Sequence, residues 1–163
     1  MHPHEQVIRD FYAAFAKRDA KGMAACYHPD IFFSDPAFQN LHGEEASAMW
    51  AMLCERGKDL EIILVNARAD QDGGTATWHA NYTFSQTGRK VHNEIDAMFA
   101  FKDGKIVRHL DKFNFWTWSR QALGTAGQLL GWFGPFKGAV RKKAMRGLKD
   151  FMQKNAGAFP RPG

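Results

Sequence analysis

A predicted β-hairpin within residues 93–116 constrains the fold of this chain more than any other stretch. Its two apolar runs flank Asp103-Gly104, a pair typical of two-residue type I′ turns because both residues tolerate positive φ. This turn predicts that Phe101 pairs with Ile106 and, further along, Asp96 with Asp111. Because side chains alternate across a sheet, one face should carry Asp96, Met98, Val107, His109, Asp111 and Phe113. Two carboxylates that face each other destabilise a sheet, unless water screens their repulsion or one of them stays protonated.

A second predicted turn extends this face to a third strand. Residues 75–85 are rich in β-forming residues, and Thr87-Gly88 is typical of another two-residue turn. The register that follows places His79 opposite Asp96. We therefore expect His79, Asp96 and Asp111 to lie side by side, with His109 on the same face, and we interpret this face as a candidate site.

The rest of the chain predicts an α+β fold. Helical periodicity or capping patterns occur over residues 5–17, 19–27, 44–56, 118–123, 127–133 and 135–154, and strand patterns over 31–33 and 60–69. The short strand ends at Ser34-Asp35-Pro36. Since a residue before proline is held in an extended or turn conformation, the Asp35 carboxylate could lie at the rim of the site.

The composition of the chain indicates how large a core it can form and which cellular compartment suits it. With 163 residues, 45% of them hydrophobic, the chain can bury one substantial core. Cys26 and Cys54 lack metal-ligand spacing, and we interpret them as buried thiols in a reducing compartment. The sequence contains neither a signal-peptide pattern nor an apolar run of transmembrane length, so the expected location is the cytoplasm. We expect no metal and no cofactor.

The C-terminal segment is strongly basic. Residues 134–163 contain eight Lys or Arg side chains and one acid. Aromatic side chains fall on the apolar stripe that includes Phe136, Val140, Leu148 and Phe151, rather than between basic residues as stacking platforms. This pattern favours a helix that docks on the body or on a partner subunit over one that binds nucleic acid or a membrane.

The chain resembles the nuclear transport factor 2-like superfamily, which includes the SnoaL-like polyketide cyclases and the ketosteroid isomerases. The resemblance rests on VIRDFYAAFAKRDAKGMAACYHPDIFFSDP, GRKVHNEIDAMFAF and DGKIVRHLDKFNFW. It implies a cone-shaped fold in which a curved antiparallel sheet packs on N-terminal helices around an apolar pocket. It also implies a homodimer formed through the outer face of the sheet. Residues 1–118 would be the SnoaL-like domain, and 119–163 a helical basic extension packed on the same domain.

The resemblance assigns roles to individual residues. Asp35 resembles the proton-shuttling carboxylate of ketosteroid isomerases and Asp96 their protonated oxyanion-hole acid, while Phe11 stands where they have a tyrosine. Asp111 resembles the acid/base carboxylate of SnoaL-like cyclases. Independently of the resemblance, imidazole chemistry gives His79 and His109 two interpretations: they orient these carboxylates or act as bases, or they are core histidines satisfied by a neighbouring carboxylate. A further set of apolar side chains would line the pocket and bind the ligand: Phe11, Tyr12, Phe15, Trp50, Met98 and Phe113.

Two functional hypotheses follow. The first is a cofactor-free acid/base enzyme of the isomerase, cyclase or hydratase type, acting on a small apolar carbonyl or polycyclic substrate. The second is a non-catalytic protein that binds an apolar small molecule or a protein partner. A closed apolar cavity containing the carboxylates would favour the first hypothesis.

Overall fold

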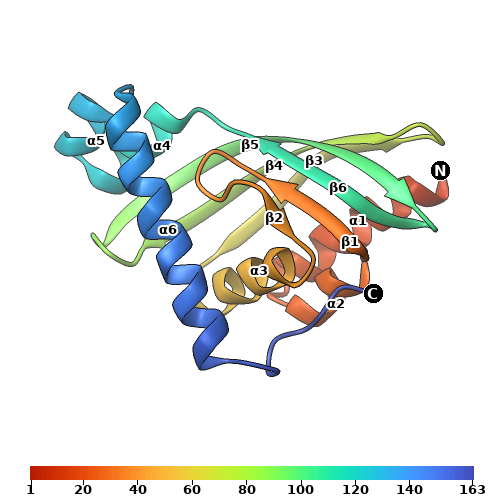
Figure 1. Ribbon diagram of the computed structural model, residues 1–163. Coiled ribbons are helices and arrows are strands. Elements are labelled where there is room, and N and C mark those ends of the chain that lie inside the picture. The colour runs from red at the N-terminus through yellow and green to blue at the C-terminus, as the bar shows by residue number, and fades with distance from the viewer.

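The computed structural model describes residues 1–163 as one mixed sheet with six helices (Figure 1). The helices are α1 (Pro3–Ala16), α2 (Ala20–Ala25), α3 (Glu44–Arg56), α4 (Phe115–Leu123), α5 (Thr125–Leu130) and α6 (Gly134–Lys154). The strands are β1 (Tyr27–Ser34), β2 (Leu41–His42), β3 (Glu61–Ala69), β4 (Gly74–Phe84), β5 (Arg89–Lys102) and β6 (Lys105–Lys112). None of the helices is both long and apolar enough to cross a membrane.

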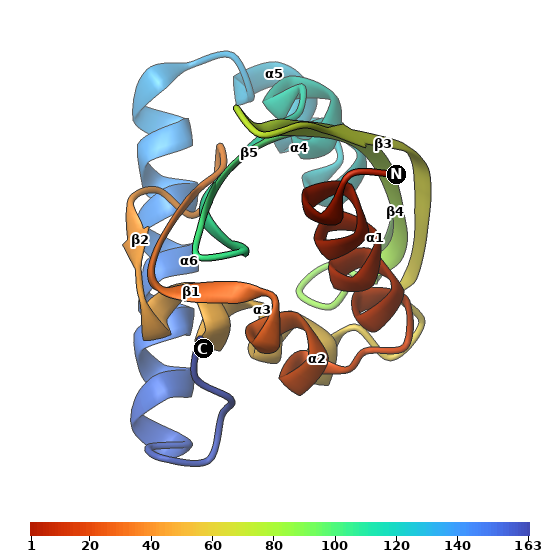
Figure 2. The same ribbon diagram turned by 90° about the vertical axis from the view of Figure 1, so that its right-hand side faces the viewer.

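The six strands lie in the order β2-β1-β6-β5-β4-β3. Neighbouring strands from β3 to β6 pair antiparallel, whereas β1 pairs parallel with β6. The sheet curves around α1, and α6 runs along the side of the molecule opposite β3 and β4 (Figure 2). The predicted α+β fold, a curved sheet packed on N-terminal helices, is therefore confirmed.

The hairpin turn forms where the sequence places it, but the register changes one step later. Asp103 and Gly104 have φ angles of 52° and 75°, and Phe101 pairs with Ile106 as predicted. A β-bulge at Val107 then adds one residue to β6, so that Ala100 pairs with Arg108. As a result Asp111 lies opposite Ala97 and Asp96 opposite Lys112. The predicted pairing of Asp96 with Asp111 is wrong, because the extra residue shifts β6 by one position relative to β5. Since side chains alternate along a strand, this shift also places Asp96 and Asp111 on opposite faces of the sheet.

The turn between β4 and β5 is longer than predicted. Phe84 pairs with Arg89, which leaves the segment 85–88 as a four-residue turn. His79 consequently lies opposite Glu94 instead of Asp96, while Thr77 lies opposite Asp96. A register shift of two residues keeps each side chain on its predicted face, so His79 and Asp96 still lie on the same face of the sheet. This is the outer face, which points away from the core.

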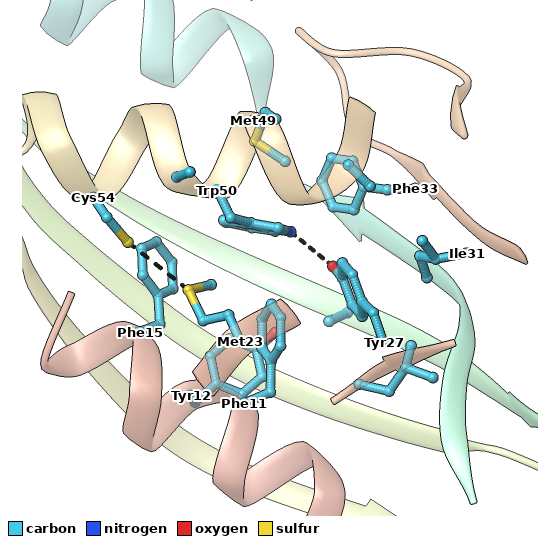
Figure 3. Close-up of a cluster of buried hydrophobic side chains, with 14 of the residues drawn as sticks. Phe11, Tyr12, Phe15, Met23, Tyr27, Ile31, Phe33, Met49, Trp50 and Cys54 are labelled. Carbon is cyan, nitrogen blue, oxygen red and sulfur yellow. Dashed lines mark hydrogen bonds between the residues drawn. The ribbon is translucent and has the colours of Figure 1, made fainter. Parts of the chain in front are cut away.

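The core lies between the inner face of the sheet and helices α1, α2 and α3, and it is rich in aromatic rings (Figure 3). Phe11 packs edge-on against Trp50, with ring centroids 5.5 Å apart, and Phe15 does the same at 5.0 Å. Leu148 and Phe151 of α6 belong to this same core. The C-terminal helix is therefore attached to the body through these apolar side chains.

Candidate functional site

A cavity of about 450 Å³ opens between the inner face of the sheet, α3 and the C-terminal helices. Most of its lining is apolar, with Phe15, Trp50 and Phe113 among the aromatic side chains. Polar side chains complete the lining: Asp35, Arg56, Tyr82, Thr83, Ser85, Gln86, Asn93, Asp111 and Lys143. A mostly apolar cavity of this size that also carries polar groups is typical of a small-molecule site.

Asp111 is held in the cavity wall by a chain of buried hydrogen bonds. Trp50 Nε1 donates to the Tyr27 hydroxyl at 2.7 Å, a hydrogen bond drawn as a dashed line in Figure 3. This hydroxyl lies 2.8 Å from His109 Nδ1. His109 Nε2 lies 2.8 Å from Asp111 Oδ1. Asp111 and His109 are both buried, although no sequence signal linked them to Tyr27.

The direction of each hydrogen bond follows from the donors. A carboxylate can only accept, so His109 Nε2 carries the ring hydrogen and donates it to Asp111, and Nδ1 of this tautomer is an acceptor. The Tyr27 hydroxyl donates to His109 Nδ1 and accepts from the Trp50 indole N–H, which can only donate. His109 is enclosed by rings: Trp50 stacks on it at 5.8 Å and Phe33 meets it edge-on at 5.0 Å. His109 is thus placed to orient Asp111 and does not itself line the cavity.

Asp35 follows the end of β1 and reaches the same cavity. Its Oδ1 accepts hydrogen bonds from the backbone N–H groups of Ala37, at 2.7 Å, and Phe38, at 2.6 Å. Burial raises the pKa of Asp35 to about 7, and the charge of Asp111 adds to this effect, while the two backbone hydrogen bonds oppose it. Near neutral pH this carboxyl can therefore both take up and release a proton.

Tyr82 on β4 presents a donor to the cavity, and sequence reasoning missed it. Its hydroxyl accepts from Trp118 Nε1 at 2.8 Å, which leaves the hydroxyl proton free to donate. Burial raises the pKa of Tyr82 to about 12, with a further contribution from the charge of Asp35, so the hydroxyl stays protonated. The only sequence signal for Tyr82 is that it alternates in phase with Trp78 on one face of the strand.

The structure divides the residues that the sequence grouped together. Phe15, Trp50 and Phe113 line the cavity, whereas Phe11 and Tyr12 are core residues outside its lining. Met98 is exposed on the outer face. Asp96 lies there too and accepts a hydrogen bond of 2.9 Å from the Thr77 hydroxyl. The structure thus brings Asp35 and Asp111 together and separates them from Asp96 and His79.

His79 belongs to a different cluster on the outer face. Its ligand atoms and those of His92 and Glu94 all lie within 4.8 Å of one another, an arrangement that could hold a metal ion. His92 Nδ1 lies 2.5 Å from Asn81 Oδ1, which orients the ring. Because the cluster is on the face opposite the cavity, it cannot act directly on a ligand bound beside Asp111.

Comparison with solved structures finds the same fold in proteins of low sequence identity. A proposed SnoaL-like polyketide cyclase from Jannaschia sp. CCS1 matches with a TM-score of 0.66 and 13% identity, covering 76% of this chain and 92% of its own. An LEH-like epoxide hydrolase of M. tuberculosis matches with a TM-score of 0.63 and 15% identity, covering 78% and 96%. AclR, a proposed hydroxylase from Streptomyces galilaeus, matches with a TM-score of 0.61 and 19% identity, covering 78% and 96%.

Comparison with curated protein sequences finds no match. A family model, described as the SnoaL-like domain, matches residues 8–109, a stretch that begins in α1 and ends at His109 on β6. Since this match covers more than half of the chain, the protein belongs to the SnoaL-like domain family.

Proposed function

We propose that this protein is a cofactor-free acid/base enzyme that removes and returns a proton next to a carbonyl group of a small apolar substrate. The observation that carries this proposal is the presence of two carboxyl groups, Asp35 and Asp111, in one largely apolar cavity. An arrangement that moves the pKa of one carboxyl to about 7 is typical of a general acid or base. A structural neighbour named as a proposed SnoaL-like polyketide cyclase supports chemistry of this class.

In this proposal Asp35 is the base. Its carboxylate takes the proton from the carbon next to the carbonyl, and the Tyr82 hydroxyl donates a hydrogen bond to the carbonyl oxygen as the enolate forms. Where a double bond is conjugated with the enolate, returning the proton to a different carbon completes an isomerisation. Attack of the enolate carbon on a second carbonyl instead forms an alkoxide, which takes the proton back from Asp35 and completes a cyclisation. Asp111, oriented by His109, accepts a hydrogen bond from a substrate hydroxyl, and its charge adds to the burial that raises the pKa of Asp35.

The proposal is tested by hydrogen exchange, which does not require the natural product to be known. The full chain is incubated in D₂O with a panel of cyclic and polycyclic ketones, and deuterium uptake next to the carbonyl is measured by mass spectrometry. We expect the exchange rate to rise with pH and level off above about pH 7, because only the ionised form of Asp35 accepts a proton. Asp35→Asn should lower the rate about 100-fold or more.

Two further variants separate the roles of the carboxyl groups. Asp111→Asn should move the rising part of the pH profile to lower pH, since the charge of Asp111 raises the pKa of Asp35. Asp96→Asn makes the same change on the outer face and should leave the rate unchanged. An unaltered rate in Asp35→Asn would show that the proposed base is wrong. Ketones that raise the melting temperature of the protein without any exchange would instead support the binding-protein hypothesis.

A further inference from the structure

The corner between α5 and α6 exposes a run of large apolar side chains. We call these residues the apolar corner: Leu129 is 63% exposed, Leu130 44%, Trp132 69% and Phe133 45%. The Trp132 and Phe133 rings touch, with centroids 5.9 Å apart, but neither belongs to a buried cluster. Contiguous exposed apolar side chains are typical of an interaction surface, whereas single ones are ordinary.

The apolar corner continues directly into the basic helix α6. Lys142, Arg146 and Lys149 are exposed and spaced so that they share one side of this helix, while Leu148 and Phe151 are buried on another. None of the ion pairs of the protein involves a residue of α6. Asp150 is the only acid of the helix. The positive charge of this side is therefore not neutralised within the chain.

We propose that the apolar corner and the basic side of α6 together dock on a lipid bilayer that contains anionic lipids. Tryptophan and phenylalanine favour the boundary between headgroups and acyl chains, and lysine and arginine are attracted to anionic headgroups. Leucine side chains suit acyl chains better than nucleic-acid bases, which stack on aromatic rings. Contact is peripheral, because no helix can span the membrane. This reverses the expectation that the basic helix avoids membranes.

Charge complementarity distinguishes a bilayer from a second copy of this chain. A symmetric dimer through this corner would cover the apolar side chains, but each subunit presents the same patch, so the exposed cations of α6 would find no anionic partner on the other subunit. An anionic lipid surface instead neutralises the basic side of α6 while its acyl chains cover the apolar corner. Figure 1 shows α4, α5 and the start of α6 together at one end of the molecule. These helices also line the cavity through Trp118, Leu123 and Val140. Docking would therefore place the cavity beside a membrane that can supply apolar ligands. This consequence rests on the proposed function, whereas the docking proposal does not.

Vesicle co-sedimentation of the full chain tests the proposal. We expect binding to vesicles that contain phosphatidylglycerol, release at high salt, and weak binding to vesicles of phosphatidylcholine alone. Tryptophan emission should shift to shorter wavelength on binding. The pair Trp132→Ser and Phe133→Ser should weaken binding at least tenfold, and the triple change of Lys142, Arg146 and Lys149 to Gln on the order of 100-fold. Circular dichroism should confirm that these exposed changes leave the fold intact.

Val65→Ser is the matched control. Val65 is 53% exposed on β3, away from the apolar corner, and its replacement should leave vesicle binding unchanged. The proposal is overturned if the unaltered protein ignores phosphatidylglycerol vesicles at low salt, or if the Trp132 and Phe133 variant binds them equally well. Light scattering after gel filtration gives a third outcome that would overturn the proposal. If the unaltered protein is a dimer that does not bind vesicles, and the Trp132 and Phe133 variant has the mass of one chain, the apolar corner binds a second copy of the chain.

Discussion

At Tyr27, a single hydroxyl satisfies two buried nitrogen atoms, Trp50 Nε1 and His109 Nδ1. Tyr27→Phe leaves both without a partner, and each unpaired buried group costs about 1–3 kcal/mol. We expect a matching loss in the free energy of unfolding, measured by urea denaturation. Tyr12→Phe is the control, because the buried Tyr12 hydroxyl, unlike that of Tyr27, does not join two buried nitrogen atoms, so its removal should cost less. Equal losses in both variants would contradict the shared role of the Tyr27 hydroxyl.

Asp35 should make stability depend on pH in a defined direction. Its pKa is raised from 3.8 to about 7, so the unfolded chain loses this proton from about pH 4 upward while the folded protein holds it. The resulting penalty grows between about pH 4 and pH 7 and is constant above. Asn has no proton to lose, and its side-chain oxygen can still accept from Ala37 and Phe38.

Asp35→Asn should therefore raise the free energy of unfolding at about pH 8 and change it little at about pH 4. Urea denaturation of both proteins at the two pH values measures this difference. The same gain at both values would mean that the pKa of Asp35 is not raised in the folded protein. A carboxyl that weakens the folded state at neutral pH is typical of a site kept for function.

At the level of elements, local sequence predicted what forms but not how neighbouring strands align. Helix α3 has the predicted bounds, and the turn at Asp103-Gly104 sets the first pairs of the hairpin. The bulge at Val107 has no comparable signal, because Ile106 and Val107 are both apolar and either could face the core. Packing decides the matter, since Ile106 is fully buried in the structure while Val107 is not.

That choice determines the composition of the site. With the bulge, Ile106, His109 and Asp111 face inward together, and Asp96 is left on the outer face. Asp35 could be anticipated because Pro36 restricts its backbone and the family resemblance gives it a role. Tyr27 and Tyr82 could not, since their positions depend on how the curved sheet brings β1, β4 and β6 around one cavity.

For the whole molecule, the central question is whether residues 119–163 fold with the body or apart from it. Leu148 on α6 is fully buried, and it belongs to the same core as Ile8 and Phe11 on α1. Residues of α6 also complete the cavity wall opposite β4. The predicted boundary at residue 118 marks where the C-terminal extension begins in the sequence. It does not separate two cores, because apolar side chains of the extension lie in the same core as those of α1. We expect a single cooperative unfolding unit.

Leu148→Ala tests this expectation. Replacing a fully buried leucine by alanine costs about 2–5 kcal/mol, because it removes apolar contacts and leaves a cavity. If the chain is one unit, the urea midpoint should fall equally in far-ultraviolet circular dichroism and in tryptophan fluorescence, to which the buried Trp50 and Trp78 contribute. Leu129→Ala makes the same change at an exposed position and should leave the midpoint nearly unchanged. Two separate transitions in Leu148→Ala would instead mean that α6 can detach while the N-terminal core stays folded, so the cavity would lose a wall before the protein unfolds.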